Sequence, residues 1–588
     1  MTRPTASGAA LRAVGVASSA GVVLLAACIL APQSASANPG AATAAALSQT
    51  IRWSSCPKAE PPYPDPSERA ECGTVKVPVD WAKPDGRKME IAVARQKATD
   101  PEKRVGVLFS NPGGPGSAGL DDAYYADSPV EGYRKSIRAR FDIIGFDPRG
   151  IGRSGQLRCD DTLAEKIPTR PRNAADFQRM RTLNKQLADS CRERSGPIVD
   201  HMDSESVARD MDAIRTALGE KKISFLGHSY GTLIGQRYAR LFPDKLRALA
   251  LDSAMDPSRP DARRFLRDGS AATEDAVQQL ANWCEKEASC ALKGQDVKAV
   301  VRQLFARADA GKLTEPGPHG PTRKKVTADQ LTSFLSDYLG KWNPKTTAQQ
   351  LAALHSGKGK VYWIAGTPDV AWRTVICRDY DFRLPDYAHY RALLKQAASA
   401  NPHSRYNSQA LDMIVGCQGW PAATEPEPVQ AKGKLPPVLV VNAKHDLATP
   451  LPGAKRMTRA FPHARLATLD AVDHWLYRKC QSPLPARAID SYLRTLKTPP
   501  DGTVFPRPRG PAGPRHHSVV EGARASSRCR AGACRAAAGG VRPGSSRGSG
   551  WAVRSPPGAG ASAARRGRVA LLVCRWRWSG IDHRHRCA

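Results

Sequence analysis

Residues 222–231 read KISFLGHSYG, and residues 232–239 continue with TLIGQRYA. An apolar run of strand length leads into a glycine-serine turn, and apolar residues at helical spacing follow at once. Strand, sharp turn and helix are the elements of a nucleophile elbow, which would place Ser229 at the tip of the turn. The turn is so tight that a side chain at Gly227 or Gly231 would collide with the neighbouring strand or helix. The pattern therefore predicts that Ser229 is a nucleophile and not a structural turn serine.

A series of apolar runs predicts the remainder of a mostly parallel sheet. Residues 74–79 and 89–94 alternate between polar and apolar side chains, which is typical of antiparallel strands. Apolar faces at helical spacing over residues 204–218 predict the crossover helix that leads into the elbow strand. We expect residues 38–252 to form the first part of an α/β core. The runs that predict buried strands are 105–110, 141–146 and 246–252.

The β pattern stops between residues 253 and 434, where helical stretches alternate with polar loops. This segment is predicted to be an all-helical cap inserted into the core. Strand patterns resume at residues 438–442 and 465–470, so residues 435–504 are expected to complete the core. The fold class predicted from these elements is an α/β-hydrolase fold with a helical cap.

Two of the late strands end in residues that suit acyl transfer by a serine. This chemistry needs a base for the hydroxyl proton, an acid that orients the base, and backbone donors for the oxyanion. Asp446 and His474 each follow a strand, and Ser229, Asp446 and His474 occur in the order that α/β-hydrolases use. We therefore expect Asp446 as the acid and His474 as the base. The alternatives left open are Asp470 and Asp473 for the acid, and His445 and His463 for the base.

The loop Asn111-Pro112-Gly113-Gly114-Pro115-Gly116 follows a predicted buried strand upstream of the elbow. Glycine allows close approach of the backbone to a ligand, and proline fixes the turn. In the predicted fold, this is the position from which a second oxyanion N–H is supplied. The loop is therefore a candidate oxyanion loop.

The N-terminal 37 residues have the organisation of a secretory signal peptide. Two arginines and no acid accompany a mostly apolar run over residues 13–31, and Ala35-Ser36-Ala37 forms an A-x-A cleavage site. An alternative is Leu25-Ala26-Ala27-Cys28, which resembles a bacterial lipobox and would leave Cys28 as a lipid anchor. We expect a secreted chain, or one that is lipid-anchored on the outer face of the membrane, with no transmembrane span after processing.

Export favours disulfide formation between the cysteines that follow the signal segment. None of them lies in a C-x-x-C pair and no histidine cluster accompanies them, so neither a metal site nor a cofactor is predicted. Nine cysteines lie between residues 38 and 504, and an odd number leaves one without a partner. The disulfide candidates are Cys56, Cys72, Cys159, Cys191, Cys284, Cys290, Cys377 and Cys417.

Taken together, the motifs resemble the secreted tripeptidyl-aminopeptidase-like serine hydrolases, relatives of the proline iminopeptidases. The resemblance runs from about residue 53 to 504 and includes Cys377-Arg378-Asp379 and residues 417–421 (CQGWP). It implies Ser229, Asp446 and His474 as the catalytic residues and the backbone N–H groups of Gly114 and Tyr230 as oxyanion donors. It also implies release of short peptides, tripeptides among them, from free N-termini. Relatives often have glycine before the histidine, where this chain has Asp473.

Two other functions are alternatives to the peptidase. An extracellular carboxylesterase would use the same three catalytic residues equally well. The formal charge of +33 also suits a non-catalytic binder of anionic polymers. The tail (residues 505–588) contributes +15, and the +16 of residues 38–504 is dispersed without a basic stripe interleaved with aromatic residues, so no nucleic-acid partner is predicted. The sequence predicts no oligomeric state.

Residues 505–588 differ in composition from the preceding chain. They hold 17 arginines, no lysine and two acids, with abundant Ala, Gly, Pro and Ser and no amphipathic period. Such a composition is expected from GC-rich DNA translated out of frame, and the alternative is a disordered basic tail that binds anionic polymers. The family resemblance implies a final cysteine at about position 505, where this chain has Phe505. Its loss would leave Cys480 as the odd cysteine.

Overall fold

The computed structural model describes residues 49–59, 64–129, 132–258, 260–363, 369–423, 428–430, 434–478 and 482–507. The chain separates into residues 1–45 and residues 46–588, and the fold described here is that of the second unit. The predicted signal peptide, Cys28, Cys480 and residues 508–588 lie outside the described residues. No helix within the described ranges combines the length and apolar character that crossing a membrane requires.

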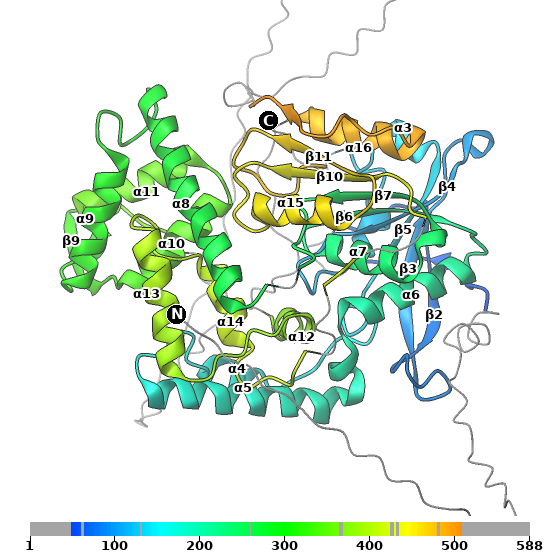
Figure 1. Cartoon of the computed structure of the whole chain (residues 1–588), viewed down its shortest axis with the longest axis horizontal. Helices are drawn as coiled ribbons and strands as arrows, with labels where there is room; N and C mark the ends of the chain where they lie inside the picture. The colour runs from blue at the N-terminus through cyan, green and yellow to red at the C-terminus, as the bar shows by residue number, and fades with distance from the viewer. Residues whose placement is uncertain are drawn as a thin grey trace, which may run out of the picture. The chain divides into compact units, whose positions relative to one another are not determined.

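Ten strands form one sheet in the order β1-β2-β3-β5-β4-β6-β7-β10-β11-β12 (Figure 1). The pairings among β1, β2, β3 and β5 are antiparallel, and all pairings from β5 to β12 are parallel. The mostly parallel sheet predicted from the apolar runs is confirmed. The strands are β1 Ser54–Ser55, β2 Ala70–Pro78, β3 Lys88–Gln96, β4 Gly106–Asn111, β5 Phe141–Phe146, β6 Ile223–His228, β7 Leu246–Asp252, β10 Val438–Ala443, β11 Ala464–Leu469 and β12 Thr503–Phe505.

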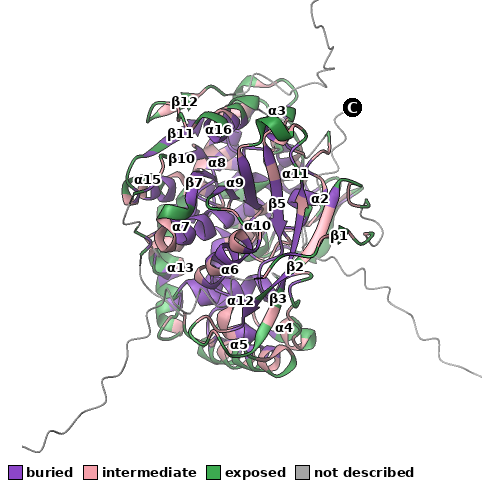
Figure 2. Cartoon of the chain, turned by 90° about the vertical axis from the view of Figure 1, so that its right-hand side faces the viewer, coloured by how far each residue is buried: buried purple, intermediate pink, exposed green. Residues whose placement is uncertain are grey.

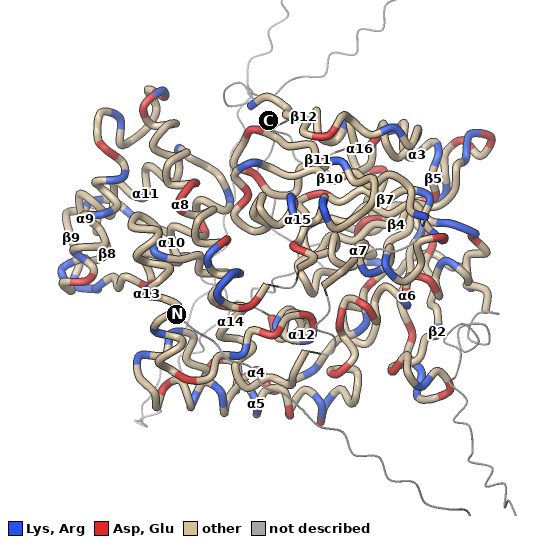
Figure 3. Tube along the Cα trace, in the orientation of Figure 1, with Lys and Arg blue, Asp and Glu red and all other residues tan. Residues whose placement is uncertain are grey.

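Helices cover both faces of the sheet, which explains why every residue of the central strands β4, β6 and β10 is buried and why most of these residues are apolar (Figure 2). One hydrophobic cluster joins the strands to α6 (Ser204–Ala217), α7 (Gly231–Leu241) and α15 (Leu451–Ala460). A second cluster joins them to α3 (Lys135–Arg138) and α16 (Pro483–Thr495). Charges of both signs are interspersed along the described chain (Figure 3).

Between β7 and β10, residues 276–354 form most of a third hydrophobic cluster, which also includes Leu447 and Val472, whereas residues 371–417 belong to the first cluster. The expectation of an all-helical segment is wrong in one respect, because β8 (Thr314–Gly317) and β9 (Gly320–Lys325) form an antiparallel hairpin. Five of the six residues of β9 are exposed, so no apolar alternation marks the hairpin in the sequence. The helices are α8 Ala262–Lys286, α9 Val297–Asp309, α10 Ala328–Gly340, α11 Pro344–Ser356, α12 Val370–Asp379, α13 Tyr387–Ala400 and α14 Ser408–Gly416.

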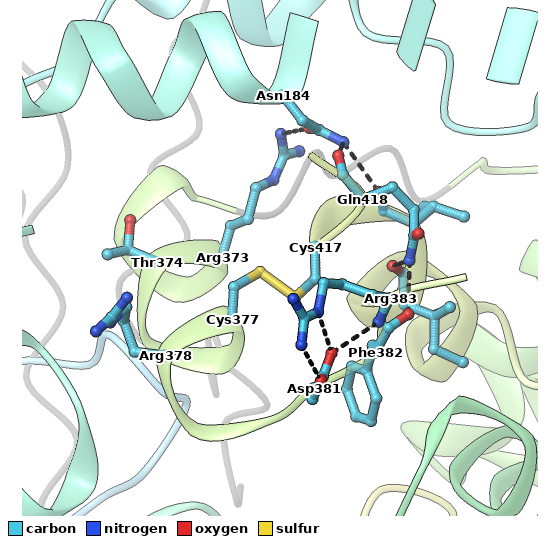
Figure 4. The surroundings of a disulfide bond; sticks show 12 residues. Asn184, Arg373, Thr374, Cys377, Arg378, Asp381, Phe382, Arg383, Cys417 and Gln418 are labelled. Carbon is cyan, nitrogen blue, oxygen red and sulfur yellow. Dashed lines mark hydrogen bonds and ion pairs between the residues drawn. A yellow bond between two sulfur atoms is a disulfide. The ribbon is translucent and has the colours of Figure 1, made fainter. Parts of the chain in front are cut away.

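Helices that the sequence analysis did not predict lie between β5 and α6. They are α4 (Asp161–Lys166), α5 (Ala174–Ser195) and the 3-10 helix Gly196–His201. Asn184 of α5 donates to the carbonyl oxygens of Val415 (3.0 Å) and Gln418 (2.8 Å) and accepts from Arg373 (2.9 Å; Figure 4). A helix from the first half of the chain therefore supports α12 and the end of α14.

The eight candidate cysteines form four disulfides, each between neighbours in the cysteine order. Cys377–Cys417 joins α12 to the end of α14 (Figure 4). Only short segments are closed, the longest sequence separation being 40 residues. The other pairs are Cys56–Cys72, Cys159–Cys191 and Cys284–Cys290.

The C-terminal boundary of the sheet differs from the expected one after Val504. Strand β12 includes Phe505, which pairs with Leu469 and accepts a hydrogen bond from the backbone N–H of Asp470 (3.0 Å). Phe505 also packs against the hydrophobic cluster around α16. The short strand escaped sequence analysis because three residues carry no recognisable period.

Candidate active site

Ser229 occupies the turn between β6 and α7, where its backbone has φ 53°. A Cβ on Gly227 would lie 2.7 Å from the carbonyl oxygen of Gly231, and one on Gly231 would lie 2.5 Å from that of Asn111. Both glycines are therefore required by close backbone contacts, as the elbow pattern implied. A positive φ is unusual for serine and costs free energy, so the surrounding structure must hold the turn in place.

Asp446 and His474 lie together beyond the ends of β10 and β11. The Nδ1 atom of His474 is 2.9 Å from Asp446 Oδ2 and 3.1 Å from Oδ1. The Asp446 side chain is fully buried, whereas the His474 side chain is 20% exposed. Nδ1 faces the carboxylate, and Nε2 is on the opposite side of the ring, which is the orientation that a histidine base has in a serine hydrolase.

The Asp446 carboxylate is fixed by its own loop. Oδ1 accepts from the backbone N–H groups of Ala448 and Thr449, both at 2.9 Å. Oδ2 accepts from the Thr449 hydroxyl at 2.8 Å, and the same hydroxyl lies 3.4 Å from His474 Nδ1. In addition to the imidazole, three hydrogen-bond donors from its own loop thus orient the Asp446 carboxylate. Thr449 was not singled out from the sequence, because its role depends on the fold of this loop.

The alternative acids and bases lie in other surroundings. His445 Nδ1 is 2.5 Å from Asp275 of α8, and its Nε2 is 3.7 Å from Asp470. Asp473 accepts from the backbone N–H of His474 at 2.8 Å. His463 is an exposed residue before β11. Among the candidate residues, Asp446 and His474 are the pair whose carboxylate and imidazole nitrogen lie within hydrogen-bond distance (2.9 Å), whereas the His445–Asp470 contact is longer at 3.7 Å.

The candidate oxyanion loop is pressed against the elbow. A Cβ on Gly113 would lie 2.4 Å from the carbonyl oxygen of His228 and 2.8 Å from the Tyr230 nitrogen. Gly113 and Gly114 have φ values of 90° and 103°, which side chains rarely adopt. The two backbone segments that would supply the predicted donors, at Gly114 and Tyr230, therefore lie next to each other.

Helix α12 contacts both of these segments. A Cβ on Gly116 would lie 3.2 Å from the backbone nitrogen of Trp372. The Tyr230 hydroxyl donates to Asp379, the last residue of α12. Asp379 also accepts from the backbone N–H (3.0 Å) and hydroxyl (2.9 Å) of Ser204. Burial, together with the nearby Asp203, raises the pKa of the Asp379 carboxyl well above its ordinary value.

Asp252, the last residue of β7, is a further member of the site that no sequence pattern indicated. Its carbonyl oxygen accepts from the Ser229 N–H at 2.9 Å. Its carboxylate accepts from the backbone N–H groups of Leu476 and Tyr477, both at 2.9 Å. Asp252 thereby connects Ser229 to the loop that carries His474. Within the described ranges, no cluster of three or more His, Cys, Asp or Glu side chains could hold a metal ion.

Comparison with known proteins assigns the family. The model of the alpha/beta hydrolase fold matches residues 107–478, and the chain belongs to this family. Within it, the chain is 32% identical to the tripeptidyl aminopeptidase of Streptomyces lividans over 489 residues, which cover 78% of this chain and 87% of that protein. The serine protease Hip1 of Mycobacterium tuberculosis is 29% identical over 492 residues, 78% of this chain and 91% of its own length.

Carboxylesterase B of Mycobacterium tuberculosis is 31% identical over 447 residues, which cover 72% of this chain and 84% of that protein. The resemblance predicted from the motifs is confirmed by these relatives. The chain is accordingly a serine hydrolase of the alpha/beta hydrolase fold family.

Proposed function

We propose that this chain is an extracellular exopeptidase that releases short peptides, tripeptides in particular, from free N-termini through an acyl-enzyme on Ser229. The observation that carries the proposal is the pairing of His474 Nδ1 with the buried Asp446 carboxylate at the sheet edge that bears the elbow. The four disulfides support an extracellular location. The choice of peptide rests on the tripeptidyl aminopeptidase relatives.

In the proposed reaction, the Ser229 hydroxyl oxygen attacks the carbonyl carbon of the scissile bond while His474 Nε2 takes its proton. Asp446 holds the Nδ1–H and stabilises the imidazolium that forms. The oxyanion accepts hydrogen bonds from the backbone N–H groups of Tyr230 and Gly114. The C–N bond then breaks and His474 returns the proton to the leaving amine. Water, deprotonated by His474, releases the peptide from the serine ester.

The segment at residues 253–434 is proposed to act as a cap that restricts access to chain ends. Helix α12 belongs to this segment. It contacts the candidate oxyanion loop at Gly116, and it also contacts Tyr230. A substrate whose chain continues far beyond the scissile bond on its N-terminal side would have to extend past this helix, whereas a short N-terminal segment would not. We propose that this steric restriction favours exopeptidase over endopeptidase action.

The test uses chromogenic amides of one, two and three residues, with free or acetylated N-termini, beside short-chain esters. We expect the tripeptide amide with a free N-terminus to give the highest kcat/KM and acetylation to suppress its cleavage. Ser229→Ala should lower kcat by about 10⁴-fold or more and abolish fluorophosphonate labelling, because alanine cannot form the acyl-enzyme. Full fluorophosphonate labelling of the Ser229→Ala variant would show that Ser229 is not the nucleophile.

A carboxylesterase is the second candidate, because carboxylesterase B is a relative of similar identity and the same three residues would cleave an ester. The substrate panel separates the two functions. Hydrolysis of the esters without any cleavage of the peptide amides would favour the esterase. Equal rates on free and acetylated peptides would argue against recognition of the N-terminus.

A further inference from the structure

The buried carboxylate of Asp252 lies between the elbow and the loop that follows His474. Both Asp252 and His228 are fully buried, and Asp252 Oδ2 is 3.0 Å from His228 Nδ1. Oδ2 also accepts from the Tyr477 N–H, while Oδ1 accepts from the Leu476 N–H, both at 2.9 Å. The carbonyl oxygen of the same residue accepts from the Ser229 N–H at 2.9 Å. Asp252 therefore contacts both the elbow that carries Ser229 and the loop that follows His474.

Three strained backbone positions surround this residue. Ser229 has φ 53°, Ser253 has φ 60° and Trp475 has φ 65°, and they are three of the seven described non-glycine residues with positive φ. The N–H of Trp475 donates to the Ser253 hydroxyl at 2.9 Å, and the N–H of Ser253 donates to the carbonyl oxygen of Val441 at 2.8 Å. Such conformations persist only where neighbouring contacts hold them. Here Asp252 holds Ser229, Ser253 holds Trp475, and Val441 holds Ser253.

We infer that Asp252 is a positioning residue, which fixes the distance between Ser229 and His474 by binding the backbone on both sides. This inference rests on the proposed function, because it assigns the nucleophile to Ser229 and the base to His474. Asp252 acts through the backbone and not as the acid, since the structure pairs His474 Nδ1 with Asp446. A misplacement of about 1 Å between reacting groups can cost about 100-fold in rate.

The first variant is Asp252→Asn, which keeps the side-chain size but replaces one acceptor oxygen by an NH₂ group. That NH₂ must face the N–H of Leu476, the N–H of Tyr477 or the His228 ring. On the tripeptide amide we expect kcat to fall about 10- to 100-fold with KM within about twofold. The rate of fluorophosphonate labelling should fall by the same factor as kcat.

The matched control is Asp490→Asn. Asp490 is also buried and holds the same loop, because it accepts from the Tyr477 hydroxyl at 2.7 Å, but it pairs with Arg134 and not with the elbow. This control variant should keep kcat within about twofold of the wild-type value. If both asparagine variants lower kcat equally, Asp252 serves only the stability of the loop and the inference is wrong.

The kcat of each variant is also measured in a protein that carries His474→Ala. If two residues act as a unit, the loss of kcat in the double variant is smaller than the product of the two single losses. We expect Asp252→Asn to cause no further loss there. A further loss as large as in the wild-type background would overturn the inference while leaving the proposed function intact. If His474→Ala alone retains full activity, the proposed function fails and the inference fails with it.

Ser253→Ala serves if Asp252→Asn does not fold. It removes only the hydroxyl that accepts from the Trp475 N–H. We expect kcat to fall about 3- to 10-fold with unchanged KM, and no further loss in the His474→Ala background. Wild-type kcat in this variant would show that the backbone at residue 475 needs no such support, which contradicts the inference.

Discussion

His474 and His445 both lie at a strand end beside an acid, yet their surroundings predict different roles in catalysis. His474 meets the buried Asp446, whereas His445 meets Asp275 of α8. We expect His474→Ala to lower kcat by about 10³-fold or more, because the serine then has no base. His445→Ala should leave kcat within about threefold. The values of kcat and KM on the tripeptide amide decide the matter, and equal losses in both variants would contradict the assignment.

Much of the site could be predicted from the sequence because each member follows a strand pattern. Ser229 is specified by the glycines around it, and the order of Ser229, Asp446 and His474 matches the fold. Asp252 also ends a strand, but its carboxylate binds the backbone N–H groups of Leu476 and Tyr477, which are more than 220 residues away in the sequence. A main-chain hydrogen bond leaves no mark on the residue types at positions 476 and 477. Contacts of this kind need the structure.

At the scale of elements, helix α10 carries a carboxyl that opposes stability at neutral pH. Burial, and to a lesser extent Asp412, raises the pKa of Asp337 to about 7, although Lys341 and Arg170 act in the opposite direction. An aspartate in the unfolded chain has a pKa of about 3.9. The folded state therefore binds a proton that the unfolded chain releases. The stability from this group is fully present below about pH 4 and is lost as the pH rises through about 7.

The variant Asp337→Asn keeps a neutral side chain at every pH. We expect its Tm to exceed that of the wild type by about 2–4 °C at pH 8 and to differ little at pH 4. Melting curves at both pH values test this. Asp309→Asn is the control, because Asp309 is exposed and its ion pair with Arg405 lies at the surface. A gain in Tm at pH 8 in the control, equal to that of Asp337→Asn, would contradict the explanation.

Helix α5 supports the elements around α12 through one buried side chain. Asn184 makes three hydrogen bonds to Val415, Gln418 and Arg373. Asn184→Ala leaves those buried groups without their partner, so we expect a loss of about 2–3 kcal/mol in the free energy of unfolding. The neighbouring Lys185→Ala removes only an exposed ion pair and should cost at most about 0.5 kcal/mol. Urea titrations compare the two, and equal midpoints would count against the role of Asn184.

The sheet was predictable where α5 was not, for a physical reason. Buried parallel strands are continuous apolar runs, and six of them stand out in the sequence. The buried stripe of α5 has helical spacing, but the polar Asn184 lies near its centre. The buried residues are Phe177, Met180, Asn184, Leu187, Ala188 and Cys191. Recognising that Asn184 is buried requires knowing the three groups that it binds.

For the whole molecule, the last described strand of the sheet is β12 (Thr503–Phe505). The stability of a protein shortened at its C-terminus should therefore depend on whether β12 is kept. We expect a chain ending at Arg507 to keep its activity and its Tm, because every described strand is then intact. A chain ending at Val504 loses Phe505 and its hydrogen bond with Asp470, and its Tm should fall by about 2 °C or more. Activity and Tm of both truncations test this. Unfolding of the longer chain would show that residues beyond Arg507 belong to the fold.

The same truncated protein tests the expectation for Cys480, which lies outside the described residues. Thiol titration in denaturant should find one reactive cysteine in a protein of residues 38–507, which lacks Cys28, and Cys480→Ser should remove it. Two or more reactive thiols in the truncated protein without the Cys480→Ser substitution would mean that a described disulfide is not formed in solution.

The pattern of disulfides also has a consequence for biosynthesis. The eight described cysteines pair in order along the chain, the first with the second, the third with the fourth and so on, and the bridged segments do not overlap. A chain that crosses a membrane N-terminus first would therefore present each partner before the following pair arrives. Oxidation in order of emergence yields the native connectivity directly, so the protein should mature with little help from an isomerase that reshuffles wrong pairs.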